Sequence, residues 1–106
     1  MKRTDSKILN QIKKIVAERE PSAKIYLYGS RSRGTSTNES DWDLLILLDK
    51  ENISTEEEQK ITYPLYDLEF DTGEVISPMI YSKKEWNSKY KITSFYKNVM
   101  KEGKLL

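Results

Sequence analysis

Hydrophobic residues between positions 8 and 16 recur every three or four residues, which is the spacing of one face of a helix. Charged residues occupy the opposite side of this segment, and Pro21 ends it. Residues 24–28 are rich in β-forming side chains and are followed by Gly29, so they predict a strand. The chain is therefore expected to begin with an amphipathic surface helix and a strand.

The most apolar run of the chain is Asp43–Leu48, which has the length of a strand. An apolar run without polar alternation is typical of a central strand that is covered on both faces. The preceding stretch, residues 29–41, is the least hydrophobic part of the chain. A connection of this length in a compact domain usually has a function. Within it, residues 30–33 are candidates for a helical turn.

A second long helix is predicted to begin at Ser54 or Thr55, where three glutamates follow. A capping residue with acidic residues in the first turn favours a helix. Gly73 is the expected end of this helix. Pro64 deletes a backbone hydrogen bond, so the pattern predicts a kink or a new helix start there.

A third strand is predicted at residues 74–81, and Pro78 favours a place at a sheet edge. Ser82 can cap a short helix, and residues 92–100 have helical spacing. The chain thus reads helix, strand, loop, strand, helix, strand, helix, helix. This order predicts an α+β fold in which a small sheet carries helices packed mainly on one face.

The length of 106 residues suits a single domain, and no linker or repeat divides residues 1–106. With 18 basic and 17 acidic residues the net charge is +1, which makes nucleic acid an unexpected partner. The apolar run is far shorter than the roughly 20 residues of a membrane span, and no apolar leader follows the basic start. These features predict a cytoplasmic protein that does not contact membranes.

The chain contains no cysteine and no histidine. This excludes disulfides, thiolate nucleophiles, the Ser-His-Asp triad and metal sites built from those two residue types. An enzyme of this composition has to work with carboxylates, hydroxyls, backbone amides and hard metal ions.

Asp41 and Asp43 stand one residue apart at the start of the apolar strand. Since strand side chains alternate between faces, both carboxylates are expected on one face and Trp42 on the other. Two carboxylates held this close suit Mg²⁺, which completes its shell with water and phosphate oxygens. A solvated loop end or a helix cap has the same pattern and stays open as the alternative.

The loop before this pair has the features of a phosphate-binding turn. Gly29 lets the backbone turn sharply after the first strand, and Ser30 adds a hydroxyl. Arg31 and Arg33 add guanidinium groups that suit phosphate oxygens. A polar loop with solvated arginines is the alternative for this segment in isolation. Together with the two aspartates, however, the loop predicts a site for a nucleoside triphosphate with its metal.

At these residues the chain resembles the minimal nucleotidyltransferases of the DNA-polymerase-β-like superfamily. The likeness rests on Gly29–Gly34, with the sequence GSRSRG, and on Ser40–Leu44, with the sequence SDWDL. It implies a nucleotidyltransferase core with a mixed sheet. It further implies that Gly29 and Ser30 hold the triphosphate of ATP and that Asp41 and Asp43 are catalytic ligands of Mg²⁺. Arg31 and Arg33 match basic positions of the motif.

One feature departs from that family, whose active members usually carry a third carboxylate on a neighbouring strand. In the predicted third strand, Ser77 stands where such an acid is expected. Glu74 is the nearest substitute, followed by Asp71 and Glu69. The departure puts the rate of catalysis in doubt more than the fold.

Two functions follow from the resemblance. The first is Mg²⁺-dependent transfer of a nucleoside monophosphate, AMP from ATP, to a hydroxyl acceptor such as a tyrosine of a helical HEPN-type partner. The second is a catalytically weak or inactive antitoxin-like subunit that binds such a partner. The chain carries little beyond the nucleotide half of a transferase, so a partner subunit or a second copy is expected to complete acceptor recognition.

Overall fold

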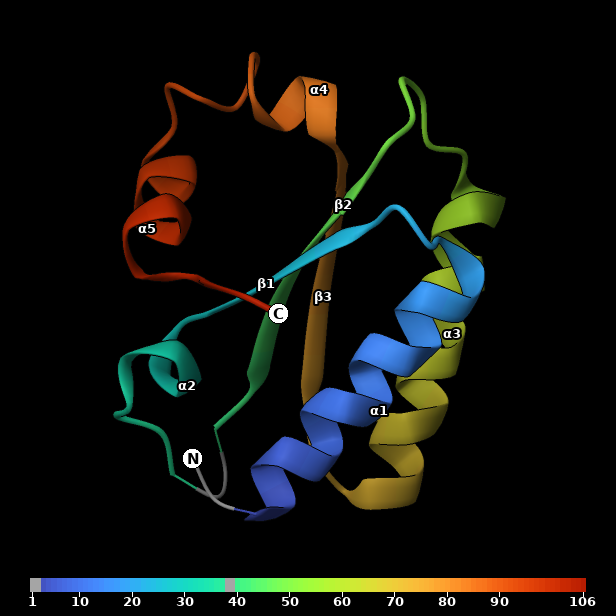
Figure 1. Ribbon diagram of the computed structural model, residues 1–106, viewed down its shortest axis with the longest axis vertical. Helices are drawn as coiled ribbons and strands as arrows, with labels where there is room; N and C mark the ends of the chain where they lie inside the picture. The colour runs from blue at the N-terminus through green and yellow to red at the C-terminus, as the bar shows by residue number, and fades with distance from the viewer. Residues whose placement is uncertain (1–2, 38–39) are drawn as a thin grey trace.

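The computed structural model describes residues 3–37 and 40–106, so positions 38 and 39 of the predicted functional loop lie outside the described residues (Figure 1). The element order agrees with the predicted one, with one added strand at the end. The elements are α1 (Arg3–Arg19), β1 (Lys24–Tyr28), α2 (Ser30–Arg33), β2 (Trp42–Leu48), α3 (Thr55–Thr72), β3 (Ile76–Ser82), α4 (Lys83–Trp86), α5 (Ser94–Glu102) and β4 (Lys104–Leu105).

The four strands form one sheet in the order β3-β2-β1-β4. β1 runs antiparallel to β2 and to β4, whereas β2 and β3 are parallel, so the expected α+β fold with a small mixed sheet is confirmed. The edge position that Pro78 predicted for the third strand is also observed. β4 was not predicted, because a two-residue strand at the edge carries no periodic pattern.

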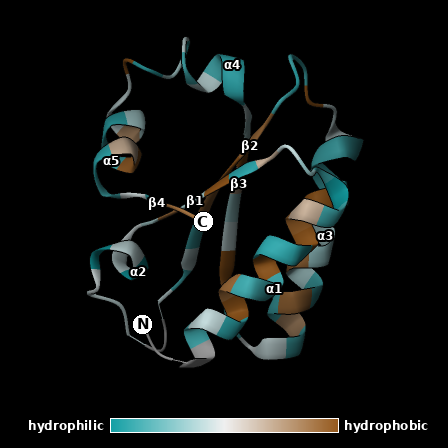
Figure 2. Ribbon diagram, viewed as in Figure 1, coloured by the Kyte–Doolittle hydropathy of each residue, from teal (hydrophilic) through white to brown (hydrophobic). Residues whose placement is uncertain are grey.

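The apolar strand β2 lies at the centre and is buried on both faces. Leu44, Ile46 and Leu48 pack in a core cluster with α1 and α3. Leu45 and Leu47 face the other way, into a smaller aromatic cluster under α4 and α5. Figure 2 shows the hydrophobic colouring along β2 and on parts of α1 and α3. Both long helices therefore cover one face, as predicted, and the two short C-terminal helices cover part of the other.

Local signals explain the bounds of α3. Ser54 forms a capping box with Glu57, and Gly73 ends the helix in the left-handed conformation. Of the two outcomes predicted at Pro64, the new helix start is wrong, because α3 continues through Pro64 as one helix of 18 residues. The kink stays a prediction. Pro64 is half-buried and lies beside Ile61, Leu65 and Leu68, which are buried. Burial of these neighbours offsets the hydrogen bond that Pro64 cannot donate.

Within residues 3–37 and 40–106, the search for a helix with the length and hydropathy of a bilayer span found none.

Candidate functional site

The turn after β1 and the start of β2 meet at one point. In the antiparallel pair Tyr28 lies opposite Asp43, which brings the next residue, Gly29, beside the carboxylate of Asp43. Gly29 has a φ of 75° and a ψ of −158°, a conformation that is almost exclusive to glycine. A Cβ at this position would collide with Oδ2 of Asp43. Only a glycine allows the turn to approach the carboxylate this closely.

The electrostatics of Asp43 show that charged groups gather here. Partial burial and the negative charge of Asp41 raise the pKa of Asp43, while the positive charge of Arg33 lowers it. Burial, together with the charge of Asp43, raises the pKa of Tyr28 to about 12. Asp41 is exposed and accepts a hydrogen bond of 3.5 Å from the hydroxyl of Ser77. The site therefore carries excess negative charge, which a cation would balance.

Arg33 and Ser30 belong to the short helix α2, which confirms the predicted helical turn at residues 30–33. Ser30 is half-buried and follows Gly29 directly, while the side chain of Arg33 is exposed. Arg33 pairs with the carboxylate of Glu102 at 3.2 Å, and the hydroxyl of Ser32 donates to the backbone carbonyl of Glu102. The end of α5 thus anchors α2. No sequence pattern indicated Glu102, because it lies 69 residues from Arg33.

Arg31 takes a different direction from the one expected of a phosphate ligand. Its guanidinium stacks 3.9 Å from the ring centre of Trp42 and donates to the carbonyl of Ser40 at 2.9 and 3.1 Å. It also lies 3.4 Å from a carboxylate oxygen of Asp5 and 3.5 Å from one of Glu74. Because Trp42 points to the opposite face of β2 from Asp43, the structure does not bring this guanidinium to the carboxylate pair. Arg31 holds the loop against the core instead.

Glu74, the nearest substitute for a third catalytic acid, lies on that same face. Its carboxylate accepts a hydrogen bond of 3.1 Å from the indole of Trp42, in addition to the contact with Arg31. Glu69 is also engaged, because it accepts a hydrogen bond of 2.7 Å from the backbone of Ile76. The carboxylates of Glu69 and Glu74 are therefore engaged in contacts that stabilise the fold, and they do not contribute to the site.

The neighbour of Asp43 on the next strand is Ser77, since the two residues are partners in the parallel β2–β3 register. A hydroxyl therefore occupies the place where a third carboxylate was expected. Among the residues that the structure describes, no three acidic side chains gather into a cluster that could hold a metal ion. The side chain that lies beside the carboxylates of Asp41 and Asp43 on the next strand is therefore the uncharged hydroxyl of Ser77.

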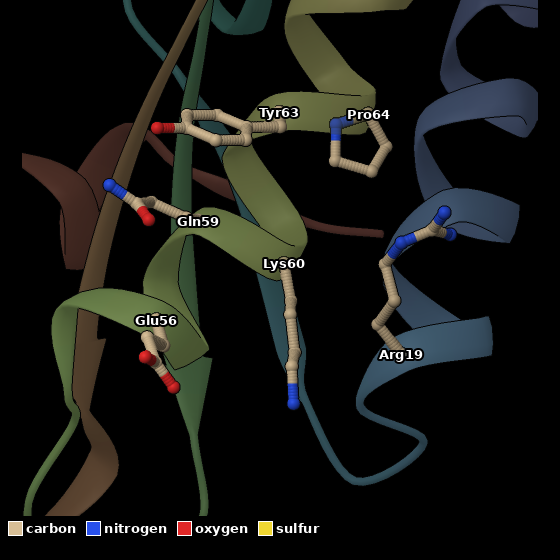
Figure 3. A pocket seen from close by; sticks show the side chains of 6 residues that line it. All are labelled: Arg19, Glu56, Gln59, Lys60, Tyr63 and Pro64. Carbon is tan, nitrogen blue, oxygen red and sulfur yellow. The ribbon is translucent and has the colours of Figure 1, made fainter.

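Three hollows among the described residues lie elsewhere. One of about 580 Å³ lies beside α1 and α3 (Figure 3), and two of about 260 and 300 Å³ lie near the ends of β3 and α1. None of these three is lined by Gly29, Ser30, Asp41 or Asp43. We place the candidate site at the carboxylate pair, because the Gly29 turn meets the carboxylate of Asp43 there and the charges of Asp41 and Arg33 act on the same group.

The role of Arg31 as a structural anchor leads to a stability prediction. We expect Arg31→Lys to lower the free energy of unfolding by about 1–2 kcal/mol, because lysine keeps the charge but loses the planar fork and the stacking on Trp42. Urea unfolding of the variant measures this loss. The control is Arg33→Lys, at an exposed side chain, which should change stability by less than about 0.5 kcal/mol. Equal losses in the two variants would contradict this assignment.

Comparison of the chain with known proteins identifies a matching family model and solved structures with a similar fold. Residues 9–106 match the family model described as a nucleotidyltransferase domain. No curated protein matches the chain.

Among solved structures, six chains match. One is described as a toxin–antitoxin with AMP-PNP; it is 21% identical with a TM-score of 0.63, and the match covers 91% of this chain and 69% of that one. Another is the toxin–antitoxin MntA-HpeT with two aspartates changed to glutamate, with 19% identity, a TM-score of 0.61 and coverages of 91% and 69%. A third is MntA-HpeT with a tyrosine changed to alanine, with 22% identity, a TM-score of 0.59 and coverages of 92% and 70%. At these identities the likeness shows a shared fold.

Proposed function

Because the chain belongs to the nucleotidyltransferase domain family, we propose that it transfers a nucleoside monophosphate, AMP from ATP, to an acceptor hydroxyl. The observation that carries the proposal is the convergence of the Gly29 turn with the carboxylate of Asp43, in the presence of Asp41 and Arg33. A turn able to approach phosphates and a pair of hard oxygen ligands then share one surface.

The chemistry of the donor set fits Mg²⁺. Asp41 and Asp43 offer carboxylate oxygens at the start of β2, and burial together with the negative charge of Asp41 raises the pKa of Asp43. Mg²⁺ commonly uses one or two carboxylates together with substrate phosphates, so two acids are sufficient ligands. When bound, it would supply charge neutralisation at the phosphate oxygens and so favour attack on the α-phosphorus.

The other residues of the site act on the nucleotide in this proposal. Gly29 and Ser30 contribute backbone and hydroxyl groups to the triphosphate, and the exposed guanidinium of Arg33 neutralises part of its charge. Arg31 contributes indirectly, because it holds the loop that carries these groups. The acceptor hydroxyl loses its proton to solvent as its oxygen bonds to the α-phosphorus. The bond from the α-phosphorus to the bridging oxygen breaks, and pyrophosphate leaves in line with the incoming oxygen.

We further propose that the acceptor is a tyrosine of a helical HEPN-type partner and that the pair acts in the cytoplasm as toxin and antitoxin. The support comes from the family resemblance and from solved structures of the same fold that are described as toxin–antitoxin complexes. One of those structures is described as containing AMP-PNP, an ATP analogue, which is consistent with a nucleotide at this fold.

A second candidate function is supported by the β2–β3 register. Ser77 stands beside Asp43, and Glu74 is committed to Trp42 and Arg31, so no third acid is available from the neighbouring strand. In this alternative the chain binds its partner and neutralises it without transferring AMP. Nucleotide and metal can still bind, since the Gly29 turn and both aspartates are retained.

One experiment separates the two functions. The chain is incubated with its helical partner, α-labelled ATP and MgCl₂, and the partner is analysed by mass spectrometry and by its own activity. Transfer of AMP to a tyrosine, with loss of partner activity, is the result expected from the first function. Neutralisation without any mass change, equally strong without ATP, would establish the binding function instead.

Adding a carboxylate in place of Ser77 tests how the metal is held. We expect Ser77→Asp to raise the affinity for Mn²⁺, used as a spectroscopic substitute for Mg²⁺, by about tenfold, because the number of charged ligands sets the affinity of such sites. Electron paramagnetic resonance titration of free Mn²⁺ measures the change. Thr72→Asp, at an exposed residue near the end of α3, is the matched control and should leave the affinity unchanged.

A further inference from the structure

The outer side of α3 carries an exposed aromatic stripe that nothing in the site uses. Tyr63, Tyr66 and Phe70 are 56%, 47% and 91% exposed, and they lie opposite the buried residues of the same helix. With Gln59 they follow one another at intervals of four, three and four residues. This is the spacing of side chains that pack along a second helix.

A hollow of about 580 Å³ adjoins the first half of this stripe (Figure 3). Gln59, Lys60 and Tyr63 line it from α3, and Arg19 lies across it on α1. Its size is sufficient for an aromatic side chain. One surface of the molecule thus carries both a projecting phenylalanine and an adjacent hollow able to receive one.

We propose that a second copy of this chain packs antiparallel along α3, so that each Phe70 enters the hollow of the other copy. With the two-fold axis between Tyr63 and Tyr66, Gln59 lies opposite Phe70 of the second copy. The two-fold axis makes the two copies equivalent, so the same arrangement buries Phe70 of both copies. Burial of these rings provides the main driving force.

The charges beside the stripe support this direction. Lys60 lies on the same side of α3 as Asp67, seven residues along, and Asp71 lies four residues further. In the described part of the chain none of the three forms an ion pair. An antiparallel two-fold pair brings each side of α3 against the same side of the other helix. Lys60 therefore lies between Asp67 and Asp71 of the second copy.

The position of this interface leaves the candidate site free. α1 and α3 cover the face of the sheet that receives Leu44 and Ile46, whereas Asp43 points to the opposite face. The inference does not rest on the proposed function, because it uses only the exposed stripe, the hollow and the charges beside them. Both sites of the dimer would remain open to nucleotide and acceptor.

Analytical ultracentrifugation of the full chain tests the proposal. The wild type should sediment as a dimer, at twice the chain mass of 12.5 kDa. Phe70→Ser should raise the dimer dissociation constant by at least about 30-fold, as expected for an aromatic side chain that fills a pocket of the partner. The control Ile92→Ser, at a residue that is 84% exposed on another segment, should leave it unchanged. Circular dichroism verifies that both variants are folded.

A charge-reversal cycle tests the antiparallel arrangement. Lys60→Glu and Asp67→Lys should each weaken the dimer about tenfold, and the combined variant should return to within about threefold of the wild type. A wild type that stays monomeric at every soluble concentration overturns the proposal and leaves the stripe to a different protein. A dimer that survives Phe70→Ser, or a combined variant that shows no recovery, overturns it as well.

Discussion

Asp43→Asn is expected to lower AMP transfer at least about 100-fold, because the variant loses one of the two carboxylates that we propose as ligands of Mg²⁺ beside the Gly29 turn. The amide side chain would keep the size and shape of the carboxylate, so the loss would report charge rather than packing. The measurement is the initial rate of label transfer from α-labelled ATP to the partner at saturating MgCl₂. Asp41→Asn is expected to behave in the same way. Persistent transfer in both variants would remove these residues from the reaction.

Stability separates a chemical role of Asp43 from a structural one. Its pKa is raised in the folded protein above the ordinary value of 3.8, by burial and by the charge of Asp41. The folded state therefore binds the proton more tightly, and the wild type loses stability as the pH rises from 3.8 through the raised pKa. Asp43→Asn should remove this loss and be more stable than the wild type at neutral pH, as followed by urea unfolding across the pH range.

The control for this pair of measurements is Asp49→Asn. Asp49 is exposed and follows the far end of β2, so its replacement should change neither transfer nor the pH dependence of stability. We expect Asp43→Asn to be more stable than the wild type but inactive in transfer. We expect Asp49→Asn to match the wild type in both measurements. Loss of stability in Asp43→Asn would instead indicate that the carboxylate supports the fold.

Gly29→Ala is expected to destabilise the protein by about 3 kcal/mol and to abolish nucleotide binding. The cost combines a backbone conformation that is almost exclusive to glycine with the collision of the new Cβ with Oδ2 of Asp43. Relief of that collision has to move either the turn or the carboxylate. Urea unfolding measures the stability, and fluorescence titration with a labelled ATP analogue measures the binding.

Gly34→Ala is the matched control for this prediction. Gly34 also has a positive φ, of 76°, but a Cβ there meets no atom within 4 Å. Gly34→Ala should lower the free energy of unfolding by only about 1 kcal/mol, which is the cost of the backbone conformation, and should retain nucleotide binding. Equal effects at the two glycines would show that the approach to Asp43 is unimportant.

Much of the fold could be predicted because its signals are local. The apolar run of β2 requires cover on both faces wherever it lies, and Ser54 and Gly73 set the ends of α3 through bonds within a few residues. Pro78 favours an edge because it lacks a backbone donor. Two features went against the local expectation: β4 was not predicted, and α3 continues through Pro64, where burial of Ile61, Leu65 and Leu68 keeps the segment together.

The candidate site was predictable only in outline. The period of two along a strand predicts that Asp41 and Asp43 share a face, and the glycine pattern indicates a turn beside them. Whether Arg31 or Arg33 turns toward the carboxylates is not encoded in that spacing. The tertiary structure decided it by placing the ring of Trp42 and the carboxylates of Asp5 and Glu74 around Arg31.

By itself, then, the sequence determined the order of the elements, the central strand and the residues from which a site can be built, because these depend on neighbours within one turn or one strand. The tertiary structure confirmed through the strand register that Ser77 stands beside Asp43, and it alone decided that Glu102 holds Arg33 and that Phe70 remains uncovered. Each of these depends on strand register or packing between segments that are far apart in the chain, and side-chain periodicity carries no information about such partners.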